Sequence, residues 1–209
     1  MVLCFRCRIE KTYLKMDSPL ILAFDTSAAH CAAALLSGDT VITQTFEPMK
    51  KGQAERLMFL LQEMLDLHSL SYTDLSAIGV GIGPGNFTGI RIGVSAARGL
   101  ALGLGIPAYG VDGFDQRAIL NSALSVQSIP GPRDQRYVRD ADDASLLDVQ
   151  AFEAKGYLIQ PDPAPDALAA SIALVARSRF PNPSAAPAPY YLKAPDAAPS
   201  KIISPTILP

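Results

Sequence analysis

The sequence predicts an α/β fold built on a mixed sheet, and two stretches of its first half support this. Between residues 21 and 46, three apolar segments separated by turn residues predict an antiparallel meander. Between residues 77 and 111, an apolar strand, a glycine-rich loop, a helix of small residues and another strand follow one another. Such a unit implies a right-handed crossover between parallel strands, so antiparallel and parallel pairs would share one sheet.

The meander consists of strands expected over 21–27, 31–36 and 41–46. The first strand ends in the small polar run Asp25-Thr26-Ser27, and Gly38-Asp39 supplies the turn between the second and third.

A helix is expected over residues 53–68. At 100° per residue, its apolar side chains cover an arc of roughly 180°, wider than the roughly 100° stripe that one packing face needs. We therefore expect this helix to have two packing neighbours, whether inside the same lobe or in another chain.

Residues 83–89 read Gly-Pro-Gly-Asn-Phe-Thr-Gly and form the most informative segment. This run cannot continue a strand or a helix, so the backbone must turn sharply, with a positive φ expected at a glycine, for which we take Gly85. The following helix would present unpaired N–H groups to which an anion could bind. Alternatively, the glycines only allow close packing, because neither Walker spacing nor the GxGxxG order is present.

The helix expected over 90–104 carries Arg91, Ser95 and Arg98 on one face and small residues around most of the rest. Each interior glycine costs a helix about 1 kcal/mol relative to alanine. Close approach to a second helix or to the sheet would offset this cost. A strand over 107–111 and a short helix over 115–120 follow.

The second half of the chain differs in composition. Thirteen of the 17 prolines fall at or after Pro130, whereas only two of the 15 glycines fall after Gly113. Prolines interrupt regular structure, so we expect short pieces around one helix over 166–177, and residues 132–138 could open this part as a strand.

Composition and charge exclude several classes of protein. The chain has 209 residues and a formal net charge of -2, so it is not expected to hold nucleic acid by itself. It lacks an apolar run long enough for a membrane span. Cys4, Cys7 and Cys31 are expected to be reduced thiols, and residues 1–19 a disordered extension or a mis-assigned start, with Met16 as a possible true beginning.

Residues 21–27 together with 83–93 resemble the TsaB (YeaZ) family, the dimerisation subunit of the bacterial complex that makes N6-threonylcarbamoyladenosine in tRNA. Residues 52–58 resemble the family's first helix, although Gln53 stands where a histidine is common. Residues 189–195 resemble its C-terminal signature. The resemblance is strong over about 20–118, weak over 188–201 and poor between them.

The resemblance implies a degenerate actin/Hsp70-like ATPase (ribonuclease H-like) fold with a shortened or divergent second lobe. The expected domains are an actin-like lobe over 20–119 and a proline-rich lobe over 120–209. An actin-like ATPase binds a nucleotide between its lobes with carboxylates and a second glycine loop. Asp25 could supply the first carboxylate, but the glycine-poor second half offers no second loop.

No catalytic residue is assigned. The catalytic relative binds metal through paired histidines, whereas His30 and His68 are far apart in this sequence. Each histidine is expected to be exposed or satisfied by hydrogen bonds. No Ser-His-Asp set stands out, although His30 follows the Asp25-Thr26-Ser27 run closely. We expect Asp25 to bond to nearby backbone amides.

The resemblance implies a non-catalytic cytoplasmic subunit that dimerises with and activates a related catalytic transferase (TsaD-like), with a TsaE-like ATPase as a further partner. ATP and metal are expected in those subunits and no cofactor in this chain, and tRNA would be reached only through the complex. The rivals are an active nucleotide-dependent transferase or peptidase, and a stand-alone homodimeric scaffold. The two long helices would supply the partner interface, through Leu57, Leu60, Leu61, Met64, Arg91, Gly93, Ala97 and Leu100.

Overall fold

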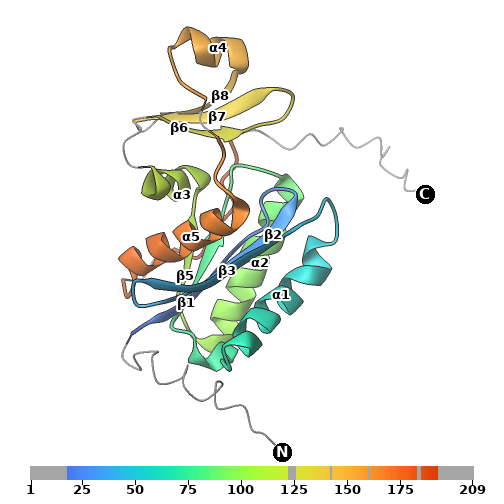
Figure 1. Cartoon of the computed structure of the whole chain (residues 1–209), viewed down its shortest axis with the longest axis vertical. Coiled ribbons are helices and arrows are strands. Elements are labelled where there is room, and N and C mark those ends of the chain that lie inside the picture. Colours follow the sequence, from blue (N-terminus) through green and yellow to red (C-terminus); the bar gives the residue numbers. More distant parts are fainter. Residues whose placement is uncertain (1–17, 122–125, 142, 160, 183–184, 193–209) are drawn as a thin grey trace, which may run out of the picture.

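A computed structural model describes residues 18–121, 126–141, 143–159, 161–182 and 185–192. A five-stranded sheet carries helices on both faces, and a three-stranded sheet lies beyond one end of it (Figure 1). The predicted N-terminal extension lies outside the described residues, apart from Ser18 and Pro19, and so does the end of the predicted C-terminal signature.

The meander is confirmed. Strands β1 (Leu20–Asp25), β2 (His30–Ser37) and β3 (Thr40–Pro48) pair in antiparallel order, with Leu22 opposite Leu35. All of β1 and nearly all of β2 are buried, because helices cover both faces of the sheet there.

The crossover is also confirmed. Strand β4 (Ala77–Gly81) runs parallel to β1, and β5 (Ala108–Val111) runs parallel to β4. Helix α2 (Phe87–Leu104) connects these two strands and begins three residues earlier than predicted. The strand order is β3-β2-β1-β4-β5, which is a mixed sheet.

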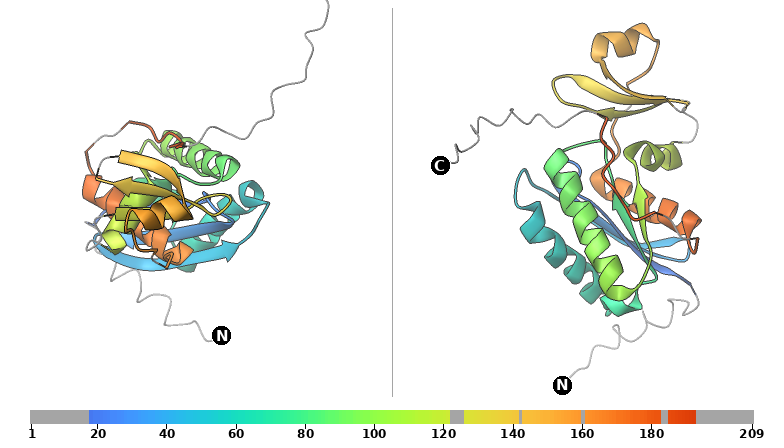
Figure 2. Two further views of the ribbon diagram at one scale, coloured as in Figure 1. Left: turned by 90° about the horizontal axis from the view of Figure 1, so that it is seen from above. Right: turned by 180° about the vertical axis from the view of Figure 1, so that it is seen from behind.

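Helix α1 (Gln53–Leu67) and α2 lie side by side on one face of the sheet (Figure 2). Leu57, Leu61 and Leu65 pack with Leu22 and Leu35 in the main core. Helix α1 contacts both the sheet and α2, so its two neighbours lie within this chain. The short 3-10 helix η3 (Tyr72–Asp74) leads from α1 toward β4.

Helix α5 (Pro165–Arg179) covers the opposite face of the same sheet (Figure 1). Ile172, Ala173 and Ala176 pack against Ile21 and Tyr109 in a second core. The prediction of a helix over 166–177 is therefore confirmed. Its contact with the first sheet was not predicted, and the chain from residue 120 onward returns to the sheet of the first lobe. The division into lobes at residue 119 stays a prediction.

The three-stranded sheet consists of β6 (Val126–Pro130), β7 (Gln135–Asp140) and β8 (Asp143–Asp148), all antiparallel. Of these three strands, only β7 was expected from the sequence, as residues 132–138. Helix α3 (Gly113–Leu120) precedes this sheet and α4 (Val149–Ala154) follows it.

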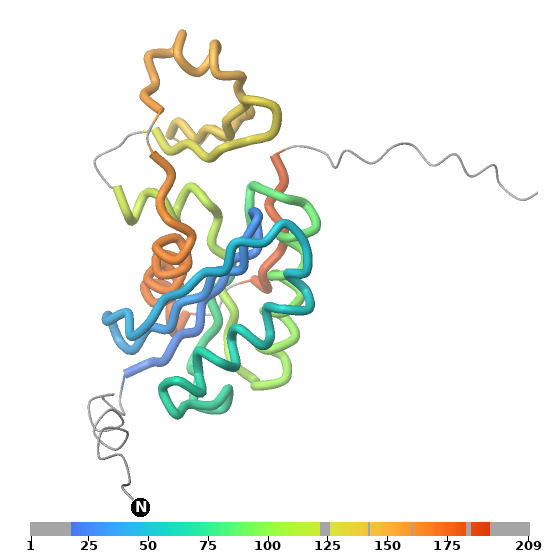
Figure 3. Tube along the Cα trace, turned by 45° about the vertical axis from the view of Figure 1, so that its right-hand side comes forward, coloured from blue at the N-terminus to red at the C-terminus, as the bar shows by residue number. Residues whose placement is uncertain are grey.

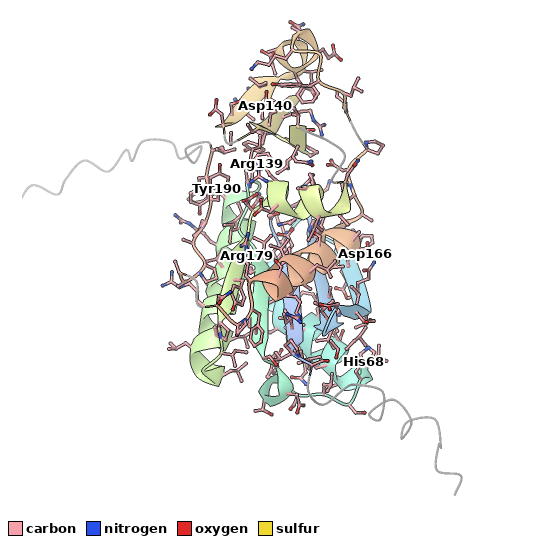
Figure 4. The ribbon with its side chains drawn as sticks, turned by 90° about the vertical axis from the view of Figure 1, so that its left-hand side faces the viewer. His68, Arg139, Asp140, Asp166, Arg179 and Tyr190 are labelled. Atoms are coloured by element: carbon pink, nitrogen blue, oxygen red, sulfur yellow. The ribbon has the colours of Figure 1, made fainter. Side chains whose placement is uncertain are left out.

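A chain of ion pairs joins the three-stranded sheet to the rest of the fold. Arg139 on β7 pairs with Asp112 and with Asp115, and Arg179 at the end of α5 pairs with the second oxygen of Asp115 at 2.8 Å. Figure 4 labels both arginines, with Arg139 above Arg179. Arg179 also donates to the Gly110 carbonyl, so the network reaches β5.

Candidate functional site

The glycine loop is folded tightly under the end of β1. A Cβ on Gly85 would overlap the Ser27 carbonyl oxygen, and one on Gly89 would overlap the Thr26 carbonyl oxygen. The positive φ of this turn belongs to Gly83, at 100°, and not to Gly85. Gly85 and Gly89 are therefore required for close approach to β1.

The N-terminus of α2 is bonded to this chain's own residues. Asn86 caps the helix, because its Oδ1 accepts from the Gly89 N–H at 2.8 Å. The Asn86 N–H donates to the Ser27 carbonyl, and Thr26 Oγ1 donates to the Gly89 carbonyl at 2.7 Å. These bonds favour the structural interpretation of the loop over an anion site.

Asp25 is buried beside the loop, with only 2% of its surface exposed. Its Oδ2 accepts from Ser27 Oγ at 2.9 Å and lies 2.9 Å from His30 Nε2. The prediction that Asp25 bonds to backbone amides is wrong, because the two partners of Oδ2 are the side chains of Ser27 and His30. His30 is satisfied as predicted.

This cluster is not a nucleophilic triad. Ser27 donates to the carboxylate, whereas a nucleophilic serine must contact the histidine that takes its proton. His68, the other histidine, has a buried Nε2 without a hydrogen-bond partner among the described residues, so it is neither exposed at that atom nor satisfied. No group of three or more metal-ligating side chains occurs in the described part of the chain.

The buried thiol of Cys31 is expected to be unreactive. Burial, with a smaller contribution from Glu47, raises its pKa from 9.0 to about 11. A thiol with so high a pKa is protonated at neutral pH, and it is therefore a poor nucleophile and a poor metal ligand.

Most of the predicted interface residues lie in this chain's own core. The side chains of Leu57, Leu60, Leu61 and Met64 are at most 5% exposed, because this side of α1 packs on the sheet. Gly93 and Ala97 are buried on the inward side of α2, where a Cβ on Gly93 would lie 2.8 Å from Thr26 Oγ1. All six are buried within this chain, and their assignment to a partner interface stays a prediction.

The two remaining predicted residues differ. Leu100 is half-buried against the main core. Arg91 is exposed; its guanidinium lies 3.9 Å from the centre of the Phe87 ring, and its Nε donates to the Tyr191 hydroxyl. Tyr191 stacks on Phe87 at 4.7 Å, so these contacts attach residues 185–192 to the start of α2 (Figure 3).

The outward surface of the two helices carries a different set of side chains. We define the α1/α2 outer face as these exposed residues: Met58, Phe59, Arg91, Ser95, Arg98, Gly99, Leu102 and Gly103. Phe59 is 66% and Leu102 is 86% exposed. A Cβ on Gly99 or on Gly103 would meet nothing within 4 Å. The residues predicted on α2 from the sequence lie mostly on its inward side, because small residues occur on both sides of the helix.

An ion-pair cluster borders this face on α1. Arg56 Nη2 lies 2.6 Å from Glu47 on β3 and 2.6 Å from Glu63, which is about two helical turns further along α1. Hydrogen bonds from Arg56 hold the pKa of both carboxyls below their ordinary value, and the two carboxylates raise the pKa of Arg56.

A cavity of about 470 Å³ is the second candidate site. It lies between the end of β1, the glycine loop and the turn that joins β6 to β7. Asp25, His30, Phe87, Tyr137 and Arg117 are among its lining residues.

Comparisons with known proteins match part of this chain. A family model described as TsaD, tRNA N6-adenosine threonylcarbamoyltransferase, matches residues 45–125. The tRNA threonylcarbamoyladenosine biosynthesis protein TsaB of Escherichia coli (strain K12) is 42% identical over 91 residues, which are 44% of this chain and 39% of the relative. TsaB of Bacillus subtilis (strain 168) is 41% identical over 98 residues, 47% of this chain and 43% of the relative. The chain thus spans about two fifths of these relatives' length.

Solved structures show the same fold. YeaZ from Pseudomonas aeruginosa superimposes with a TM-score of 0.61 at 24% identity, over 78% of this chain and 93% of that one. A protein described as having similarity to peptidase YEAZ from Pseudomonas aeruginosa gives a TM-score of 0.65 at 22% identity, over 84% of this chain and 100% of that one. The predicted α/β fold with a mixed sheet is therefore confirmed, and the YeaZ structures share it.

Proposed function

We propose that this chain, which over about half of its length belongs to the TsaB (YeaZ) family, is a non-catalytic subunit of the tRNA N6-threonylcarbamoyladenosine modification system. In this proposal it dimerises with a related transferase subunit (TsaD-like) and activates it. The observation that carries the proposal is the α1/α2 outer face, which belongs to the matched part of the chain.

The composition of α2 supports a helix-to-helix contact at this face. Arg91, Ser95, Arg98 and Leu102 recur at intervals of three and four residues, so they form one exposed row along the helix. Gly99 and Gly103 lie beside this row with open space above them. Interior glycines cost helix stability, and this cost is offset if a partner helix approaches closely there.

Apolar exposure on both helices supports the same contact. Phe59 on α1 and Leu102 on α2 leave most of their surface in water. Large side chains exposed on two adjacent helices are typical of a protein interface when they gather on one face. Arg91 and Arg98 add hydrogen-bond donors at its edge.

The chemistry of the described residues supports a non-catalytic role. The Ser27 hydroxyl donates to the Asp25 carboxylate, Cys31 is a high-pKa thiol, and Asp25 Oδ2 is bonded to Ser27 and His30. We propose that ATP and metal are handled by the TsaD-like subunit and a TsaE-like ATPase. This chain would meet tRNA only within the complex, and it would form a homodimer when alone. None of the described helices combines the length and apolar character needed to cross a bilayer; we propose a cytoplasmic location.

Reconstitution tests the proposal. The full chain, the TsaD-like and TsaE-like proteins of the same organism and the enzyme that supplies the threonylcarbamoyl donor would be mixed with tRNA, and N6-threonylcarbamoyladenosine would be measured after nuclease digestion. We expect product only when this chain is present, and neither product nor ATP hydrolysis from this chain alone. Product formation at the same rate without the chain, or turnover by the chain alone that Asp25→Ala abolishes, would contradict the proposal.

A further inference from the structure

The cavity beside the glycine loop contains a histidine with one open ring nitrogen. His30 is 7% exposed and lines this cavity. Its Nε2 lies 2.9 Å from Asp25 Oδ2, and because a carboxylate only accepts, we place the ring proton on Nε2. Nδ1 makes no hydrogen bond to the described residues, and it is not among their fully buried atoms that lack a partner. Nδ1 of the neutral ring is therefore an acceptor that a molecule in the cavity can reach.

Two further polar groups of the cavity also have their donors engaged. Gln116 on α3 is 3% exposed, and its Nε2 donates to the Val111 carbonyl at 3.1 Å, which leaves its Oε1 as an acceptor. Ser27 Oγ donates to Asp25 Oδ2 at 2.9 Å and keeps its own lone pairs. Asn86 is the opposite case, because its Oδ1 caps α2, but this residue is exposed. The less exposed polar groups thus favour a ligand that donates from N–H or O–H.

The charged residues of the cavity are already engaged within the chain. Asp25 and Arg117 are the described lining residues with a permanent charge. Asp25 Oδ1 is buried and Oδ2 has two side-chain partners, so neither oxygen is open to a cation. Arg117 Nη2 pairs with Asp162 at 3.0 Å, and Nη1 donates to the Gly113 carbonyl at 3.1 Å. An ionic ligand would lose hydration here without meeting a free opposite charge, so we expect a neutral one.

Apolar and aromatic side chains form much of the remaining wall. Pro84, Ile129 and Leu168 line the cavity, together with the rings of Phe87 and Tyr191, whose centres lie 4.7 Å apart. A volume of about 470 Å³ lies in the range of small-molecule sites, roughly 300–1,000 Å³. These walls favour a compact aromatic body.

We propose that this cavity binds a small neutral aromatic molecule that carries an N–H or O–H donor. The donor bonds to His30 Nδ1, and the aromatic body packs between Phe87, Ile129 and Leu168. The contact of Nε2 with Asp25 orients the imidazole and strengthens Nδ1 as an acceptor, because hydrogen bonds in a chain polarise one another. A ligand without the donor leaves Nδ1 unpaired in a desolvated site, and it binds more weakly for that reason.

The probes are benzimidazole and 1-methylbenzimidazole, which share one aromatic body and differ in whether a ring nitrogen carries a hydrogen or a methyl group. Binding to the full chain would be followed by protein-detected NMR at up to about 10 mM, the range expected for fragments of this size. We expect saturable shifts with benzimidazole, centred on His30 and Phe87, and at least tenfold weaker binding of the methylated probe. Equal binding of both probes, or no saturable shifts with benzimidazole, would overturn the proposal.

A variant of His30 tests the acceptor itself. His30→Gln keeps an amide N–H that can reach Asp25 and places no acceptor where Nδ1 lies. We expect it to bind benzimidazole at least tenfold more weakly and to bind both probes equally, whereas a purely structural role of His30 would leave the preference between the probes unchanged. A preference for benzimidazole that persists in this variant would overturn the role of Nδ1.

A second pair of variants locates the site, also if His30→Gln melts early. Ala28→Phe should abolish benzimidazole binding, because Ala28 is exposed and lines the cavity, and a ring there would fill it. Ala29→Phe is the matched control, since Ala29 is exposed and is not a lining residue. Binding retained in Ala28→Phe, or lost equally in both phenylalanine variants, would overturn the assignment to this cavity.

Discussion

Thr26 contacts Gly89 through both its side chain and its backbone. The Thr26 hydroxyl donates to the Gly89 carbonyl at 2.7 Å, and the Thr26 carbonyl oxygen occupies the space that a Gly89 Cβ would need. This pair joins the end of β1 to the first turn of α2. It fixes the distance between the sheet and the helix that carries the proposed interface.

The first prediction concerns this contact. Gly89→Ala should destabilise the fold by several kcal/mol, because the new methyl group overlaps backbone that cannot move freely. Gly99→Ala is the matched control in the same helix, where open space and better helix propensity should stabilise by up to about 1 kcal/mol. Urea unfolding measures both free energies. Similar values for the two variants would show that the close approach is not required.

The second prediction concerns the buried pair of Asp25 and His30. His30→Ala should cost about 3–5 kcal/mol, because it removes a major partner of a buried carboxylate. His68→Ala should cost less, since His68 Nε2 has no described partner to lose. The midpoints of denaturant unfolding compare the two. A larger loss for His68→Ala would contradict the importance of the pair.

The third prediction concerns pH. Arg56 lowers the pKa of Glu47 and Glu63 in the folded chain, so both acids release protons on folding at acidic pH. Their contribution to stability is complete above the ordinary carboxyl pKa of 4.5 and is lost as the pH falls through the lowered values.

Arg56→Gln should therefore melt below the wild type at pH 7, by a small margin because the pair is exposed to solvent. The difference between the two melting temperatures should shrink as the pH falls below 4.5. Lys51→Gln, which removes a charge outside these ion pairs, is the control. A margin that grows on acidification would show that the pKa values are not lowered.

The fourth prediction separates the two sides of α2. Ala97→Glu places a carboxylate in the main core, where Ala97 is fully buried, so the melting transition should collapse. Ser95→Glu places the same group on the exposed row and should leave the melting temperature nearly unchanged. Thermal melts followed by circular dichroism test this. Equal melting temperatures would place Ala97 outside the core.

The sequence was sufficient to predict the first sheet, because strong apolar strands and short turns specify local pairing there. It also predicted the glycine loop as a turn. The positive φ was expected at Gly85, whereas the structure has it at Gly83. Gly85 is crowded by the Ser27 backbone, which lies 58 positions earlier in the chain, so a local sequence pattern cannot predict this contact.

Burial was harder to predict than secondary structure. Small residues lie on both the inward and the outward side of α2, so Ala97 and Gly99 could not be told apart by size. The three-stranded sheet was missed except for part of β7, because its strands are short and only partly buried. The contact of Asp25 with His30 depends on the turn between β1 and β2, which brings the two side chains back together.

Calorimetric titration of the TsaD-like partner with Leu102→Glu tests the proposed interface most directly. Leu102 is 86% exposed, so this variant should melt like the wild type. Ile119→Glu on α3 is the matched control, since Ile119 is also an exposed apolar residue but lies away from the α1/α2 outer face. We expect Leu102→Glu to weaken binding at least a hundredfold while Ile119→Glu binds like the wild type. Wild-type affinity in Leu102→Glu would contradict the assignment of this face as the partner interface.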